Sequence, residues 1–338
     1  MRFAFCLWCV VFLFSCERSF EFKDEKVVVR IPSGFPPINY PEGNEPTKLR
    51  IELGRRLFYD NRLSANHQVN CSSCHVLSAA FTDSKTTSTG LAGIPGKRNS
   101  PTLANMAWMP RLMMEGGVPT LEAQALAPLH DSLEMGMNMM FAVAELNKDD
   151  ELRAMSLAAY NRDSIDPYVV TRALAAFQRT IISGDSRWDR YRQGQKKEMN
   201  ETELYGMRLF FSDQTQCSSC HSGIFFSDFN YYNIGLEEIY SDNGKERATH
   251  LSEDIGKFKT PTLRNIALTA PYMHDGRMNS LEEVVTFYNE GGKHHVNKDE
   301  RIHALNLTEE EQMHLIAFLK TLTDWNFVQN AQLSPIIN

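Results

Sequence analysis

The sequence predicts a mainly α-helical protein that is built from two related lobes. Leu49, Leu53 and Leu57 recur at i, i+4 and i+8, as they would on one face of a helix. Further along, Pro167 opens an apolar run that continues toward Gly184, with the proline at the start and the glycine at the end that helices favour. No alternating run of useful length indicates a strand.

An internal repeat indicates the two lobes. Gly54–Tyr59 (GRRLFY) recurs as Gly206–Phe211 (GMRLFF), and Pro101–Asn105 (PTLAN) recurs 160 residues later as Pro261–Asn265 (PTLRN). Repeated segments of this kind are the mark of a duplicated structural unit. The polar stretch from Gly184 to Gln195 is the expected boundary between the two units.

Each half of the repeat contains one Cys-x-x-Cys-His segment. Two thiols three residues apart, followed directly by a histidine, are typical of c-type haem attachment. Each thiol adds to a haem vinyl group, and the imidazole becomes the proximal iron ligand. A structural zinc site would need a second ligand pair, and a redox Cys-x-x-Cys does not need the histidine. The residues concerned are Cys71, Cys74, His75, Cys217, Cys220 and His221.

The class is therefore two cytochrome c-like haem lobes related by internal duplication, with two covalently bound haem c groups. The chain has 338 residues, 42% of them hydrophobic, which is enough for two domains with full cores. Its formal net charge of −7 argues against a nucleic-acid partner and is compatible with a basic redox partner.

Residues 1–15 are expected to be a signal peptide of the lipoprotein type. Arg2 is followed by an apolar run, Phe3 to Phe14, that is too short to span a bilayer. A small residue then precedes Cys16, so we expect cleavage before this cysteine and a lipid on its thiol. A plain signal peptide is the alternative. Both kinds of signal peptide predict a periplasmic protein. The lipoprotein type also predicts that a lipid anchors the protein to a bacterial membrane.

The cysteine count agrees with this interpretation. Of seven cysteines, Cys6 and Cys9 leave with the signal peptide and four belong to the haem motifs, so Cys16 alone remains. No disulfide is needed. Residues 16–47 are expected to be an extended tether, because they are rich in proline and show little helical periodicity.

Catalysis at a haem iron requires a sixth coordination position that is open. In the second lobe, Ser280 can cap a helix that turns Tyr288 inward, where it could bind the second iron; Met273 and Met278 are the alternative ligands. A packed core tyrosine is an equally common outcome. In the first lobe, residues 76–97 contain no histidine and no methionine, which predicts an open first haem.

Three polar residues follow that loop in the first lobe: Gln124, His130 and Glu134. Peroxide cleavage needs a base that takes a proton from one oxygen and an acid that returns it to the other. A carboxylate whose pKa is raised by a haem pocket can do both. Each of the three residues, taken alone, could equally be an ordinary surface or core residue.

From about Leu49 to Leu322, the chain resembles the bacterial di-haem cytochrome c peroxidase / MauG family. Besides the two haem motifs, the resemblance rests on Leu53–Phe58, Pro261–Asn265 and Pro271–Gly276 (PYMHDG). It implies that residues 48–190 form an N-terminal peroxidatic haem domain and residues 191–338 a C-terminal electron-transfer haem domain.

The resemblance also implies roles for single residues. Glu134 matches the family's catalytic acid and base, and Gln124 its pocket glutamine. A calcium ion between the lobes would be held by the Asn99 side chain and by the backbone carbonyls of Thr269 and Pro271, and oxygen ligands suit calcium.

Three departures from the family pattern matter. Tyr288 stands where many members have a methionine ligand, which is the MauG-like choice. The distal histidine of many members falls near Leu91, so reductive release of that ligand should not be required. The tryptophan usually found between the haems falls at Met114, with Trp108 nearby as a substitute.

The leading hypothesis is a periplasmic peroxidase that reduces hydrogen peroxide to water with electrons from a small c-type cytochrome or a cupredoxin; the family resemblance leaves room for a homodimer. The alternative is a MauG-like oxidase that acts on a protein or organic substrate through a high-valent state. From a different class, the chain could be an electron carrier without peroxide chemistry.

Overall fold

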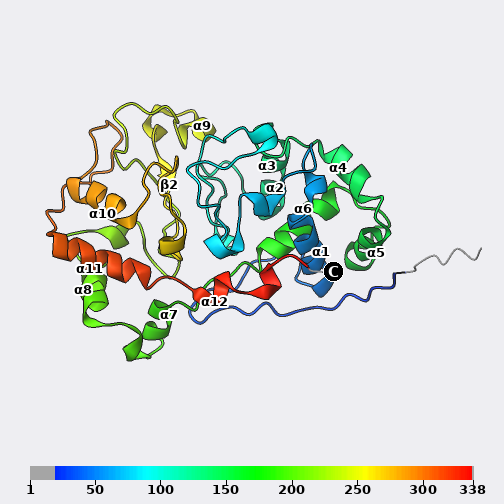
Figure 1. Cartoon of the computed structure of the whole chain (residues 1–338), viewed down its shortest axis with the longest axis horizontal. Helices are drawn as coiled ribbons and strands as arrows, with labels where there is room; N and C mark the ends of the chain where they lie inside the picture. Colours follow the sequence, from blue (N-terminus) through cyan, green and yellow to red (C-terminus); the bar gives the residue numbers. More distant parts are fainter. Residues whose placement is uncertain (1–19, 337–338) are drawn as a thin grey trace, which may run out of the picture.

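The structure is a computed structural model that describes residues 20–336. It has two helical lobes side by side, and the polypeptide crosses between them near α7 and again near α12 (Figure 1). The signal peptide and Cys16 lie outside the described residues. The first lobe contains α1 (Lys48–Phe58), α2 (Leu121–Gln124), α3 (Leu126–His130), α4 (Met139–Leu146), α5 (Asp150–Tyr160) and α6 (Pro167–Gln178).

The second lobe follows with shorter irregular connections. Its helices are α7 (Arg187–Arg192), α8 (Glu201–Phe210), α9 (Glu246–Thr249), α10 (Leu281–Glu290) and α11 (Glu309–Lys320), and α12 (Trp325–Val328) comes after them. Two short strands, β1 (Tyr231–Tyr232) and β2 (Phe258–Lys259), pair antiparallel, with Tyr231 opposite Lys259. The mainly α-helical class predicted from the sequence is confirmed.

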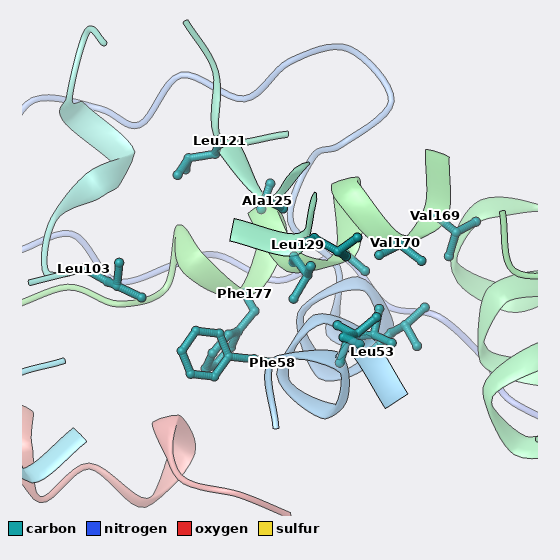
Figure 2. Close-up of a cluster of buried hydrophobic side chains, with 14 of the residues drawn as sticks. Leu53, Phe58, Leu103, Leu121, Ala125, Leu129, Val169, Val170 and Phe177 are labelled. Atoms are coloured by element: carbon teal, nitrogen blue, oxygen red, sulfur yellow. The ribbon is translucent and has the colours of Figure 1, made fainter. Parts of the chain in front are cut away.

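The core of the first lobe is built where α1 crosses α6. Leu53, Phe58 and Phe177 are fully buried there, and the rings of Phe58 and Phe177 pack against each other with centroids 5.3 Å apart (Figure 2). Gly54 makes the crossing close: a Cβ atom at this position would lie 1.8 Å from the carbonyl oxygen of Ala173. Only glycine therefore allows α1 to approach α6 at this distance.

The second lobe repeats this packing between α8 and α11. A Cβ atom on Gly206 would lie 1.8 Å from the carbonyl oxygen of His314. Gly54 and Gly206 are the first residues of the repeated motif, so the repeat in the sequence corresponds to one helix crossing that occurs twice. Asn105 and Asn265, which end the other repeated motif, both have left-handed backbones, with φ of 63° and 62°.

Helix α6 ends before the glycine that the sequence suggested. Asp166 caps its first turn and Pro167 follows, as predicted, but the helix stops at Gln178 instead of continuing toward Gly184. The backbone beyond it is engaged by the neighbouring loop: the carbonyl of Ile181 accepts the Asn105 backbone N–H at 2.8 Å, and that of Ser183 accepts its side-chain amide at 3.0 Å.

Residues 20–47 are extended and run along the lower edge of the first lobe as far as its junction with the second (Figure 1). They do not act as a free spacer as expected for a tether, because several of their side chains are buried. Phe35 packs edge-on against Trp108 of the first lobe and Phe225 of the second, with ring centroids 5.2 and 5.1 Å apart. The Asn44 side-chain amide donates to Glu122 at 2.9 Å. Proline content predicted the extended backbone but not its packing.

The C-terminal residues return to the first lobe, although the sequence assigned them to the second domain. Phe327, Val328 and Leu333 join the core of the first lobe, and the Tyr59 hydroxyl donates to the carbonyl of Leu333 at 2.6 Å. Among the helices of residues 20–336, none has the length and apolar character needed to cross a membrane.

Candidate active site

Both Cys-x-x-Cys-His segments face one cavity, which lies between the lobes and has a volume of about 540 Å³. Its wall is largely apolar, as a haem requires. The four motif cysteines on this wall form no disulfide with one another. Burial raises the pKa of the Cys71 thiol to about 12. The six predicted haem ligands and attachment residues are thus gathered on the wall: Cys71, Cys74, His75, Cys217, Cys220 and His221.

The two motif histidines are held in the same way. Nδ1 of His75 lies 2.9 Å from the carbonyl oxygen of Phe81, and Nδ1 of His221 lies 3.0 Å from that of Phe226. Since a carbonyl can only accept, Nδ1 carries the proton and Nε2 is left with a free lone pair. Burial lowers the pKa of both imidazoles, which keeps them neutral. Neutral imidazoles with a fixed tautomer fit axial haem ligation.

Glu134 and Gln124 both line the cavity in the first lobe. Burial, with a smaller contribution from the charge of Asp131, raises the pKa of the Glu134 carboxyl. The Glu134 carbonyl accepts the backbone N–H of Leu91 at 3.0 Å, and a Cβ atom on Gly90 would lie 1.9 Å from the neighbouring carbonyl of Leu133. The glycine therefore allows the loop to hold the Glu134 turn in place.

Two other first-lobe residues lie away from the cavity wall. His130 is exposed, so of the three polar candidates only Gln124 and Glu134 are brought to the site. The side chain of Leu91 lies close to Gly136, where a Cβ atom would be 2.3 Å from its Cδ1. Within the described residues, the part of the loop from 76 to 97 that lines the cavity contains no histidine and no methionine; it consists of Thr82, Ser88, Thr89, Gly90, Gly96 and Lys97.

On the second lobe, Tyr288 and Met273 line the cavity, whereas Met278 packs against the core of that lobe. Ser280 caps α10, as predicted, by accepting the backbone N–H of Glu283. Burial, followed by the nearby thiols of Cys217 and Cys220, raises the pKa of Tyr288 well above its ordinary value. No hydrogen-bond partner for its hydroxyl is present among residues 20–336, so the oxygen is available to a ligand in the cavity.

The repeat gives Tyr288 a counterpart that the sequence analysis missed. At the same 160-residue offset, the first lobe has Pro128, which also lines the cavity. Proline has no side-chain donor atom for iron. The offset between the repeated motifs was the signal that could have found this asymmetry.

The three residues expected to hold calcium, Asn99, Thr269 and Pro271, all line the cavity between the lobes. The Asn99 amide nitrogen donates to the Lys85 carbonyl at 2.8 Å, which leaves its side-chain oxygen free. Within the described residues, no donor reaches that oxygen or the carbonyls of Thr269 and Pro271. Three free oxygens suit calcium. A cluster of three histidine, cysteine or acidic side chains for a metal ion is absent from residues 20–336.

Met114 lines the cavity at the position of the expected tryptophan. Trp108 is not on the cavity wall: its indole N–H donates to the Pro36 carbonyl at 2.9 Å, and its ring contacts Phe225 with centroids 5.4 Å apart. Trp108 thus bridges the two lobes beside the cavity.

A duplicated helical fold with two such histidines on one cavity defines a two-haem cytochrome, and comparisons with known proteins agree. The family model for di-haem cytochrome c peroxidases matches residues 48–197. The methylamine utilization protein MauG of Methylorubrum extorquens is 33% identical over 88% of this chain and 84% of its own length. Cytochrome-c peroxidase IdrP1 of Denitromonas iodatirespirans is also 33% identical, over 85% of each chain.

Among solved structures, a MauG-like protein associated with microbial copper homeostasis superposes with a TM-score of 0.86 and 36% identity, over 90% of this chain and 97% of that one. The chain belongs to the di-haem cytochrome c peroxidase family. The family and the haem-lobe fold predicted from the sequence are therefore confirmed, and membership implies two haem groups.

Proposed function

We propose that the protein is a periplasmic di-haem peroxidase that reduces hydrogen peroxide to water with electrons from a small c-type cytochrome or a similar one-electron donor. The observation that carries this proposal is the asymmetry of the cavity: in the first lobe, Glu134 lines the wall and the loop of residues 76–97 brings no histidine or methionine to it, whereas Tyr288 lines the wall in the second lobe. Relatives named cytochrome-c peroxidase support the reaction type.

The chain would hold both haems covalently. The thiols of Cys71 and Cys74, and of Cys217 and Cys220, are placed on the cavity wall where they can add to vinyl groups. The Phe81 and Phe226 carbonyls fix the imidazoles for iron ligation, as described above. When bound, the first haem supplies the iron at which the O–O bond is broken, and the second supplies a site for electron entry.

Glu134 is proposed to move the proton. Ionised, it takes a proton from the oxygen of peroxide that lies nearer the first haem, and it then donates that proton to the departing oxygen, which leaves as water. With two electrons and two protons, one peroxide gives two water molecules. A buried carboxyl with a raised pKa is suited to both steps. Gln124, on the same wall, can orient peroxide by hydrogen bonding without competing for the proton.

Tyr288 is proposed to close the second haem, with Met273 as the alternative ligand because it also lines the cavity. A tyrosinate ligand stabilises ferric iron and lowers the potential, whereas methionine raises it. A calcium ion on Asn99, Thr269 and Pro271 would tie the lobes together beside the haems. Export to the periplasm, where a lipid on Cys16 would anchor the protein, completes the proposal.

A second candidate function is a MauG-like oxidase that acts on a protein or organic substrate. Tyr288 favours it, and so does the 33% identity to MauG. The methionine at position 114, where a tryptophan is usual, speaks against it, because an aromatic ring between the haems is the expected route for charge.

One assay separates these functions. The holoprotein is mixed with hydrogen peroxide and a reduced small c-type cytochrome, and oxidation of the cytochrome is followed over many turnovers. A peroxidase oxidises two cytochromes per peroxide in a sustained reaction. Absence of sustained turnover in a protein with both haems in place would contradict the peroxidase and leave the oxidase.

A further inference from the structure

Lys259 is a half-buried cation that the proposed mechanism does not use. It lies on β2, and its backbone N–H donates to the Met114 carbonyl at 2.9 Å. Its Nζ atom donates to the carbonyl of Arg111 at 2.8 Å. Both acceptors belong to the first lobe. The backbone and the side chain of Lys259, a residue of the second lobe, are therefore both bound across the seam between the lobes. Its side chain lines the cavity.

The charge of Lys259 has no acidic partner within the described residues. No carboxylate lies within 4.0 Å of its Nζ atom, and the nearest acid that affects it, Glu115, is bound to Arg98 at 2.5 Å. Burial lowers the pKa of the Lys259 ammonium to about 8. A charge that is partly removed from water and bound by one neutral carbonyl is stabilised when an anion accompanies it.

The other cations on the cavity wall are already satisfied or exposed. Arg98 forms ion pairs with Glu115 and Asp242, and Arg301 forms one with Asp299. Lys97 is exposed to solvent. Among the described residues that line the cavity, Lys259 is therefore the half-buried cation that lacks an acidic partner.

Haem brings the missing anion. It carries two carboxylates, at the edge of the ring away from the vinyl groups that cysteines use. We propose that Lys259 binds a haem carboxylate at the seam between the lobes and raises the reduction potential of that haem. This inference rests on haem binding in the cavity, which is part of the proposed function, but it does not depend on peroxide chemistry. A positive charge near a haem stabilises the reduced form, which has one positive charge fewer.

The test measures the potentials of both haems by spectroelectrochemistry, after the haem content of each variant has been determined. In Lys259→Gln, the side chain can still donate to Arg111 but has no charge. We expect one of the two midpoint potentials to shift to a lower value and the other to shift less. Lys259→Arg keeps the charge, so its two midpoint potentials should stay at the wild-type values. A residue with only a structural role would not show this dependence on charge.

Lys257→Gln is the matched control, because it removes the same charge two residues away. Lys257 is bound to Asp254 at 3.1 Å, does not line the cavity, and leaves Asp254 with Lys245 as a partner. The two midpoint potentials of the Lys257→Gln protein should equal those of the wild type. Resonance Raman spectra provide a second readout: the bending band of a haem carboxylate should move in Lys259→Gln but not in Lys257→Gln.

Wild-type potentials and an unchanged carboxylate band in a Lys259→Gln protein with two haems would overturn the inference, whatever the peroxidase activity. Lys259→Met is the second variant in case the first does not fold, and the same outcomes apply to it. A protein that shows the potential shift but no peroxide turnover would support the inference and contradict the proposed function.

Discussion

Pro128 and Tyr288 occupy corresponding positions in the two lobes, and both line the cavity between them. The duplication supplied two similar sites with the same histidine geometry, since each Nδ1 atom is fixed by a phenylalanine carbonyl. The residues at positions 128 and 288, however, differ between the two lobes. One lobe has a residue that cannot bind iron at this position, and the other has a residue whose hydroxyl has no hydrogen-bond partner among residues 20–336.

Removing the Tyr288 hydroxyl should open the second haem. We expect Tyr288→Phe to convert a low-spin ferric haem to a high-spin one, because the phenyl ring keeps the packing of α10 and lacks the oxygen ligand. Electronic absorption spectra of the ferric holoprotein measure this. Tyr272→Phe is the control: the Tyr272 hydroxyl also lies near the cavity but donates to the Ile266 carbonyl at 2.8 Å. An unchanged spectrum in Tyr288→Phe would transfer the ligand role to Met273.

Glu134→Gln should keep both haems and lower kcat/KM for peroxide by about 10²–10⁴-fold, the range of general acid–base catalysis. Glutamine preserves the shape of the side chain and cannot accept the proton. Steady-state peroxide turnover checks this, with Glu145→Gln on the exposed side of α4 as the control. Turnover within a factor of two of the wild type would remove Glu134 from the mechanism.

The pH dependence of peroxide turnover is an independent test of the Glu134 carboxyl. Glu134 acts ionised, so kcat/KM should rise with pH through its pKa, which burial and the charge of Asp131 place above the ordinary glutamate value. Asp131→Asn removes the like charge, lowers that pKa, and should move the rising limb to lower pH. Asparagine can still accept the Leu133 backbone N–H, which Asp131 accepts at 2.8 Å. A limb that does not move would show that another group titrates.

The crossing of α1 and α6 should not tolerate a side chain at Gly54. We expect Gly54→Ala to lower the free energy of unfolding by about 1–3 kcal/mol or more, as overpacked core positions do, because the methyl group would overlap the Ala173 carbonyl. Denaturant unfolding of the holoprotein measures it. Gly117→Ala is the control, since the nearest atom to a Cβ there, on Glu115, is 3.8 Å away. Equal stability of the two variants would contradict the close approach.

The buried ion pair in the second lobe should contribute more to the free energy of unfolding than an ion pair on the surface. Arg264 donates to both oxygens of Asp189, at 2.8 and 2.9 Å, and both residues are buried. Arg264→Met should lower the free energy of unfolding by about 3–5 kcal/mol, because it leaves a buried carboxylate without its partner. Lys148→Met, which breaks an exposed pair with Glu145, should change it by about 0–1 kcal/mol.

The pH dependence of the free energy of unfolding distinguishes a contribution of the Asp189–Arg264 ion pair from a contribution of packing alone. Burial alone would raise the pKa of Asp189, but the hydrogen bonds and charge of Arg264 outweigh it, and the pKa lies below its ordinary value. The stabilisation is therefore present above the pKa of the unfolded chain and is lost as pH falls through the folded value. The difference between wild type and Arg264→Met should shrink in acid; a constant difference would indicate packing alone.

Much of this architecture could be predicted from the sequence, because its signals are local. The spacing of Cys71, Cys74 and His75 is set within one helical turn, and the repeat of Gly54 at Gly206 records a helix crossing. Three features depend on contacts between distant segments and had no local signal. They are the packing of Phe35 between the lobes, the return of Leu333 to the first core, and the position of Lys259 on the cavity wall.

The site was predicted unevenly for the same reason. Gln124, His130 and Glu134 were all candidates from the residues alone, and only the family resemblance singled out Glu134 and Gln124. The structure places both on the cavity wall. His130 looked equally suitable in the sequence, but it is exposed. Whether a polar side chain reaches the cavity depends on how the turn at Gly90 holds the segment, and only the fold contains that information.

The central claim is that one haem is open on the side of Glu134 while the other is closed by a protein ligand. Electron paramagnetic resonance of the purified ferric holoprotein tests it most directly, because it reports the axial ligation of both irons in one spectrum. We predict one high-spin signal and one low-spin signal, with the low-spin signal lost in Tyr288→Phe. Two low-spin signals in the wild-type protein would contradict the claim and identify a closed electron carrier.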